Sequence, residues 1–218
     1  LQDDMRRLLS YHIQSQVGYM VAGVGIGGAL ATSGAFGHVF NHILYKSLLF
    51  MAIGAVIYRT GKERIKKLGG LGGKMPITAI TFFVAAFAIS GFPGFNGFIS
   101  KGMVVSAAHK KHLDILWYLL LIGGVGTFLS FIKLGYYVFL TGSYEGSVKQ
   151  STNRQKVSML VVAFLCILYG IYPQILYEIL PTNFNYHAYT VGHIVEVLVL
   201  AFIAVLGFVI LKNSLKKI

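Results

Sequence analysis

Residues 34–58 read GAFGHVFNHILYKSLLFMAIGAVIY, and this stretch decides the fold. It contains no Asp, Glu or Arg, and its only His and Lys residues are His38, His42 and Lys46. A segment this long and this apolar predicts a transmembrane helix. Spacing by four residues places the three side chains on nearly one helix face. Ionisable groups at membrane depth are costly unless they face protein or water, so this His–Lys row predicts a path for protons.

The composition of the whole chain agrees with a membrane protein. Hydrophobic residues make up 56% of the 218 residues and charged residues 12%, and the mean hydropathy is +0.69. These values are typical of integral membrane proteins and argue against a soluble domain. The single cysteine, Cys166, lies in an apolar run and excludes an internal disulfide.

We therefore expect an all-α, polytopic helical membrane protein with about six transmembrane helices, one of them broken. The break is expected at Gly91, Pro93, Gly94 and Gly97, because a proline removes a backbone donor and glycines loosen a helix. Lys101 follows four residues later. The expected spans are about 14–33, 34–58, 77–108, 115–140, 157–180 and 191–211.

Lysine and arginine residues are distributed unevenly between the expected loops. Fourteen of the 19 fall in the segments that share one side with the N-terminus, and only Lys110 and Lys111 fall in the loops of the other side. The positive-inside rule then places both termini in the cytoplasm. This topology explains the net charge of +12. We therefore expect the basic residues to face lipid headgroups and not to bind nucleic acid.

Several motifs, taken together, resemble a known family. The first motif is DMRRLLSYH at residues 4–12, followed by SQVGYM at 15–20. The next are His38-x3-His42-x3-Lys46-Ser-Leu-Leu-Phe, LGGL with Met-Pro at 68–76, and GFISK at 97–101. In this order they resemble the antiporter-like subunits of respiratory complex I, of membrane-bound hydrogenases and of Mrp-type Na+/H+ antiporters. The resemblance covers about the first 140 residues well and the remainder loosely.

This resemblance implies the C-terminal half of an inverted-repeat fold. Residues 1–140 would form the second half-channel, and residues 141–218 would add further spans. Full-length members carry an N-terminal bundle with a first half-channel, which this chain does not show. We therefore expect that half-channel and other membrane subunits as partners, together with the lipid bilayer and protons, with Na+ as the alternative ion.

Individual residues can be assigned expected roles. Lys46 lies too deep in its span to reach the headgroups, so it is a candidate proton carrier, with His42 and His38 as relays. His-x3-His could also bind a metal or haem, but no third ligand lies nearby in sequence. Lys101, beyond the break, is the candidate outer proton site. Lys133 is either a relay or an interfacial anchor, and we interpret Glu196 and His193 as a capping or interface pair.

The predicted function is proton translocation in a membrane subunit of a complex I-like energy-converting complex of the prokaryotic cytoplasmic membrane, either a quinone oxidoreductase or a hydrogenase. Two alternatives remain open: a subunit of a multisubunit Na+/H+ antiporter, and a non-conducting scaffold. We expect no catalytic residue, no cofactor and no metal in this chain, because flavin, iron–sulfur, haem and nucleotide signatures are lacking. A GxGxxG match at 23–28 lies in an apolar span and indicates helix packing instead.

Overall fold

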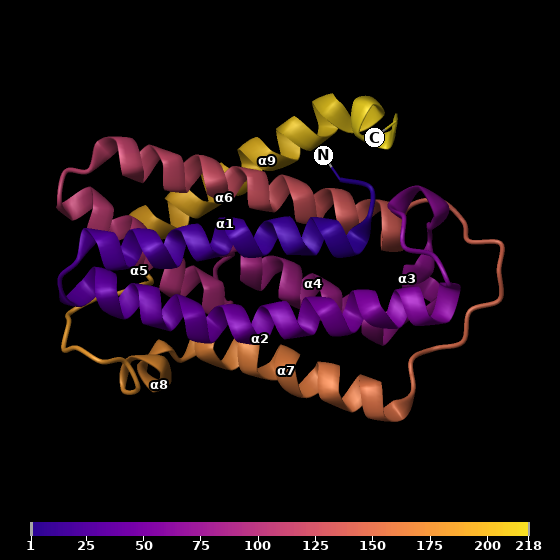
Figure 1. Cartoon of the computed structure of the whole chain (residues 1–218), viewed down its shortest axis with the longest axis horizontal. Coiled ribbons are helices and arrows are strands. Elements are labelled where there is room, and N and C mark those ends of the chain that lie inside the picture. The colour runs from indigo at the N-terminus through magenta and orange to yellow at the C-terminus, as the bar shows by residue number, and fades with distance from the viewer. Residues whose placement is uncertain (1, 218) are drawn as a thin grey trace.

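The computed structural model describes residues 2–217, and the side chains of residues 2–212. Helices account for the regular structure of these residues, and the only β pairing among them is an isolated bridge between Asp4 and Arg64. The long helices run side by side along one axis, with α9 diverging from the bundle toward the C-terminus (Figure 1). The all-α prediction is confirmed. The longer helices are α1 (Met5–Ile26), α2 (Ala29–Thr60), α4 (Pro76–Ser90), α5 (Asn96–Lys110), α6 (Asp114–Gly135), α7 (Asn153–Ile171) and α9 (Val191–Lys217).

Shorter elements connect them: the 3-10 turn Ile65–Lys67, α3 (Leu71–Lys74), the π-helical turn Tyr136–Leu140 at the end of α6, and α8 (Pro173–Tyr177). Four stretches are long and apolar enough to cross a membrane, namely α2, Asp114–Leu140, α7 and Val191–Lys212, and Pro76–Ser90 is a shorter apolar helix. The protein is therefore an integral membrane protein. At about 1.5 Å per residue, each of these four stretches is long enough for a bilayer core about 30 Å thick, and the 32 residues of α2 exceed it.

The first two helices begin and end elsewhere than the sequence predicts. The turn between α1 and α2 lies at Gly27 and Gly28, whereas hydropathy places the boundary between residues 33 and 34. Both glycines have positive φ values, 67° and 82°, which side chains rarely adopt. Gly23 serves close packing, since a Cβ there would lie 2.9 Å from Ala35 Cβ. The glycine pattern thus forms a tight helical hairpin.

The third expected span is two helices. α4 ends at Ser90 and α5 begins at Asn96, and the chain between them turns at Gly91 (φ 82°) and Gly94 (φ 91°). Pro93 lies within this non-helical segment. Gly97 does not belong to it, because it lies in the first turn of α5. A Cβ on Gly97 would overlap the carbonyl oxygen of Ala88, so glycine allows the two half-helices to touch.

α2 occupies the centre of the bundle and packs against α1, α4, α5 and α7. The core around it includes Leu48, Leu49, Phe82 and Met159, which are at most 1% exposed. Cys166, on α7, is fully buried in the same core, so residues on both sides of the expected boundary at 140 contribute to it. α9 packs mainly on α6 and exposes much of its apolar surface.

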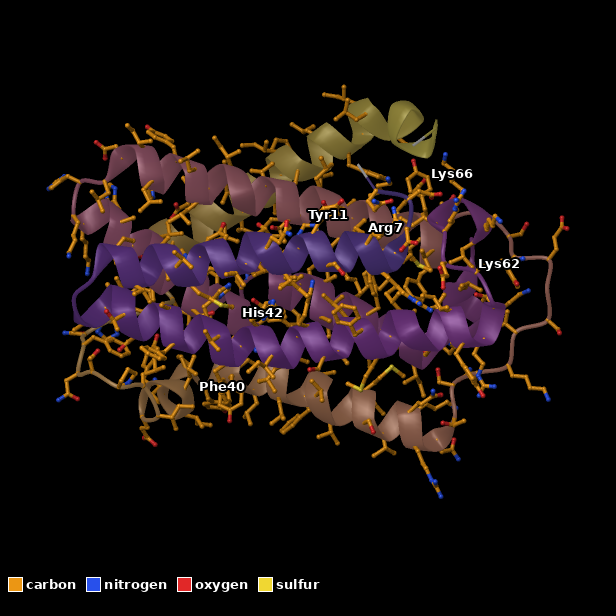
Figure 2. The ribbon with its side chains drawn as sticks, viewed as in Figure 1. Arg7, Tyr11, Phe40, His42, Lys62 and Lys66 are labelled. Carbon is orange, nitrogen blue, oxygen red and sulfur yellow. The ribbon has the colours of Figure 1, made fainter. Side chains whose placement is uncertain are left out.

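The basic residues gather at one end of the bundle. Arg7, Lys62 and Lys66 lie there in Figure 2, where α1 begins and α2 ends. The loop between α6 and α7 lies at the same end. The side chains of Lys216 and Lys217, which the sequence places on this side, lie outside the described residues. We call this the basic end, and the end that contains the turn between α5 and α6 the opposite end.

Candidate functional site

Lys46 is buried in the middle of the bundle. Its side chain is 5% exposed, and its Nζ donates a hydrogen bond of 2.6 Å to the backbone carbonyl of Leu9 on α1. The same Nζ lies 5.7 Å from the centre of the Phe50 ring. The Leu9 carbonyl lies inside α1 and also accepts the helical bond from residue 13, using its second lone pair for the amine. Lys46 therefore links two continuous helices.

Lys101 is equally buried, at 7% exposure, but its partner comes from the broken helix. Its Nζ donates a hydrogen bond of 2.7 Å to the carbonyl of Ile89, near the end of α4. In a continuous helix that carbonyl would accept from residue 93, but Pro93 has no N–H. The amine fills the place of the missing donor. It also meets the negative end of the α4 dipole and lies 4.9 Å from the centre of the Tyr19 ring.

His38 connects three helices through its two ring nitrogens. Nδ1 lies 3.0 Å from the Ser100 hydroxyl on α5, and Nε2 lies 3.1 Å from Oε1 of Gln16 on α1. The Tyr45 hydroxyl lies 3.3 Å from the same Nε2. A neutral ring that donates from Nε2 to Gln16 and accepts from Ser100 satisfies both contacts. His38 thus joins the His–Lys row to the residue next to Lys101.

His42 lies one turn from both His38 and Lys46, near the middle of α2 beside α1 (Figure 2). It is partly buried and packs edge-on against Tyr45, with ring centroids 5.5 Å apart. Its Nε2 is buried without a hydrogen-bond partner among the described residues. A buried ring nitrogen of this kind needs a hydrogen-bond partner such as water.

Three buried amides surround this row, and the sequence alone did not single them out. Gln16, Asn41 and Asn96 are fully buried, and each has at least one side-chain atom without a partner in the described part of the chain. Asn41 Nδ2 donates to the carbonyl of Asn96, 2.9 Å away. Tyr19 and Ser100 were missed as well. An amide inside an apolar span is a signal that could have found the first three, because a buried amide needs partners.

Lys133 lies apart from this group, near the basic end. It is 2% exposed, and its Nζ is 3.3 Å from the carbonyl of Gln2. It lines a cavity of about 450 Å³ together with Tyr11 and His12, and a second of about 430 Å³ together with Asp3 and Lys66. No contact joins Lys133 to Lys46 or Lys101 among the interactions of the described residues. Both roles considered for it, relay and anchor, stay predictions.

The buried amines lack carboxylate partners. Arg6 and Glu63 form an exposed ion pair, 3.0 Å apart, whereas neither Lys46 nor Lys101 has a carboxylate partner within the described residues. No three His, Cys, Asp or Glu side chains gather as a metal site in residues 2–212. An amine without a carboxylate partner is costly to bury inside a membrane. The fold and these residues define a polytopic membrane protein with ionisable groups along its interior.

Comparison with known proteins identifies its relatives. The sequence profile described as "NADH:quinone oxidoreductase/Mrp antiporter, TM" matches residues 1–130, more than half of the chain. The chain belongs to this family. The match includes His38, His42, Lys46 and Lys101, and excludes Lys133 and the whole of α7 and α9. The family resemblance of the motifs is confirmed.

Two relatives illustrate how far the similarity extends. An uncharacterized protein of Methanocaldococcus jannaschii is 37% identical over 180 residues, which cover 80% of this chain and 37% of that protein. A subunit of the Na+/H+ antiporter of Alkalihalophilus pseudofirmus is 41% identical over 138 residues, 63% of this chain and 28% of that protein. The chain thus spans well under half the length of either relative.

Two solved structures share the fold. A chain of the membrane-bound sulfane sulfur reductase, an archaeal respiratory membrane complex, superposes with a TM-score of 0.77 at 34% identity, over 84% of this chain and 31% of that one. A chain of the Mrp complex from Dietzia sp. superposes with a TM-score of 0.76 at 22% identity, over 81% of this chain and 41% of that one. The second likeness establishes the fold only.

Proposed function

We propose that this chain translocates protons along Lys46, His42, His38 and Lys101, as one half-channel of a membrane subunit in a complex I-like energy-converting complex. One observation carries the proposal. Two amines are buried at membrane depth, each bonded to a backbone carbonyl and neither paired with a carboxylate among the described residues. Such groups can exist with or without their extra proton, which is what a proton carrier needs.

The residues between the two amines support a continuous path. His42 and His38 follow Lys46 at steps of one helical turn, about 6 Å each. His38 then contacts Ser100, the neighbour of Lys101 in the chain. The unpartnered atoms of Gln16, Asn41, Asn96 and His42 are sites where water would bind, because buried polar atoms are bonded to protein or to water in native proteins.

The proposed partners of this chain are inferred from its family and from the fraction of its relatives that it matches. We infer that the other half-channel, in the same polypeptide or in another, completes the path through the membrane. The relatives named above point to further membrane subunits. The basic end faces the cytoplasm in this proposal, and the membrane is the cytoplasmic membrane of a prokaryote.

The test uses membrane vesicles that contain the assembled complex. Lys46→Ala and His42→Ala should strongly lower proton translocation while the subunit content stays unchanged, since each removes one step of the path. Lys62→Ala is the matched control, because Lys62 is exposed in the loop after α2. Proton translocation at the normal rate by an assembled Lys46→Ala complex would remove the row from the path.

A second candidate is a subunit of a multisubunit Na+/H+ antiporter. It is favoured by the antiporter subunit of Alkalihalophilus pseudofirmus, which is 41% identical to this chain. The two candidates differ in what drives the protons. A sodium pulse that moves protons in vesicles without an electron donor supports the antiporter, whereas movement only with an electron donor supports the redox-driven pump. If neither condition moves protons, the scaffold alternative is favoured.

A further inference from the structure

Glu196 is an unusual acid in this chain. The sequence contains seven Asp and Glu residues, and the other six lie before α1, in loops or at helix ends. Glu196 instead lies in the second turn of the apolar helix α9, on the side of the opposite end of the bundle. It is also outside residues 1–130, which the family profile matches.

Glu196 and Lys101 line the same small cavity. Tyr19 and His193 also line it, and its volume is about 30 Å³. A space of about 10–15 Å³ on this scale holds one water molecule, so the cavity has room for a water bridge. Oε1 of Glu196 is buried and has no hydrogen-bond partner among the described residues. The carboxylate therefore has an acceptor atom available for that water.

Gly102 explains how α9 comes this close to Lys101. A Cβ at Gly102 would overlap the His193 ring and lie 2.5 Å from the Tyr186 hydroxyl. His193 also stacks on Phe98 of α5, with ring centroids 4.2 Å apart, and its Nδ1 lies 2.9 Å from the Ala188 carbonyl. His193 thus packs α9 against α5. Glu196 lies one turn further along α9, so this packing also fixes its position.

The groups around Glu196 define a direction for the proton. Lys101 faces the cavity from the inside of the bundle, with Tyr19 beside it. Tyr186, in the loop before α9, lies within electrostatic range of Glu196. Burial raises the pKa of Tyr186 to about 12, so its hydroxyl stays protonated near neutral pH. His109, in the last turn of α5, is also within electrostatic range of Glu196 and is exposed at the opposite end. Glu196 thus shares a cavity with Lys101 and lies within electrostatic range of an imidazole that is exposed at the opposite end.

We propose that Glu196 accepts the proton that Lys101 releases, and passes it to the opposite end of the bundle. The Lys101 ammonium gives a proton to water in the cavity and becomes a neutral amine. That water gives a proton to the Glu196 carboxylate, and the resulting carboxylic acid loses it toward His109 and the surface. This inference rests on the proposed function and adds its last internal step.

The test compares three variants in vesicles that contain the complex: Glu196→Gln, Glu196→Asp and Lys101→Ala. Gln preserves the shape of the side chain but cannot titrate, so Glu196→Gln should lower the translocation rate by roughly a hundredfold, the lower end of the range for a lost acid or base group. Glu196→Asp should retain translocation with a shifted pH profile. Glu178→Gln is the matched control, because Glu178 is an exposed acid near the same end.

A second readout separates proton transfer from a structural role. The infrared difference spectrum during turnover should contain a carboxylic acid band that is absent in Glu196→Gln and shifted in Glu196→Asp. If Lys101→Ala is active, the proposed function itself fails. If Lys101→Ala is inactive while Glu196→Gln works normally, only the role of Glu196 is overturned. If Glu196→Gln does not assemble, an unchanged pH profile and an unchanged band in Glu196→Asp overturn it.

Discussion

Lys46 and Lys101 are both buried amines bonded to a carbonyl, but the helices that hold them differ. Lys46 belongs to the continuous helix α2 and shares a carbonyl that α1 already uses for its own helical bond. Lys101 follows the break between α4 and α5 and binds a carbonyl that Pro93 leaves without a helical donor. This difference predicts that the break between α4 and α5 needs the Lys101 amine for its stability, whereas α1 does not need the amine of Lys46.

The largest expected effect concerns the contact of the two half-helices. Gly97→Ala should destabilise the protein by about 3 kcal/mol or more, because the new Cβ would overlap the Ala88 carbonyl oxygen and neither backbone can yield easily. Gly126→Ala, on α6, is the control, since a Cβ there has no atom within 4 Å. The thermal unfolding of the purified complex measures both. Equal unfolding temperatures for the two variants would show that the half-helices α4 and α5 can move apart without loss of stability.

Replacing each lysine by methionine sharpens the comparison. Lys101→Met should be less stable than Lys46→Met by about 1–3 kcal/mol, because only the Ile89 carbonyl then loses its sole donor in the described structure. The Leu9 carbonyl keeps its partner inside α1. Each variant replaces one buried lysine by a methionine of similar length. The free energy gained by no longer burying a charged amine is therefore similar in both, and it largely cancels in the comparison. Denaturation by urea or heat checks the difference, and the reverse order of stability would contradict the role given to Pro93.

The smallest effect is expected at the turn itself. Gly91→Ala should cost about 1–2 kcal/mol, because Gly91 has a φ of 82° that other residues adopt only under strain. Its Cβ would also press on Lys101 Cδ at 3.2 Å. The matched variant is Gly54→Ala in the continuous helix α2, where a Cβ meets no atom within 4 Å and should slightly stabilise the helix. A higher melting temperature for both variants would remove the strain argument.

The sequence predicted the parts of this site that depend on local chemistry. Pro93 and its glycines predicted the interruption, and the spacing of His38, His42 and Lys46 placed them on one face. The sequence did not predict the end of α1, because hydropathy continues across Gly27 and Gly28 and only backbone geometry marks the turn. The glycine pattern there indicates close packing and does not by itself indicate a turn.

Contacts between distant segments could not be predicted from the sequence. His38 meets Gln16 and Ser100 only because α1 and α5 pack on α2, and no local pattern encodes which faces meet. Glu196 and Lys101 are 95 positions apart in the numbering and share a cavity only through the packing of α9 on α5 at Gly102. Hydropathy indicates how deep a residue lies but not which neighbour it has.

The single buried thiol of the core has a practical consequence for probing this chain. Cys166 is fully buried among apolar side chains of α7, so water-soluble maleimides have no access to it in the folded protein. The chain therefore serves directly as the background for labelling, without removal of a native residue. A cysteine introduced at an exposed position of α5 or of the described part of α9, such as His109 or Val195, would be the one accessible thiol of these 218 residues, and its labelling rate would report from which side of the membrane water reaches that position.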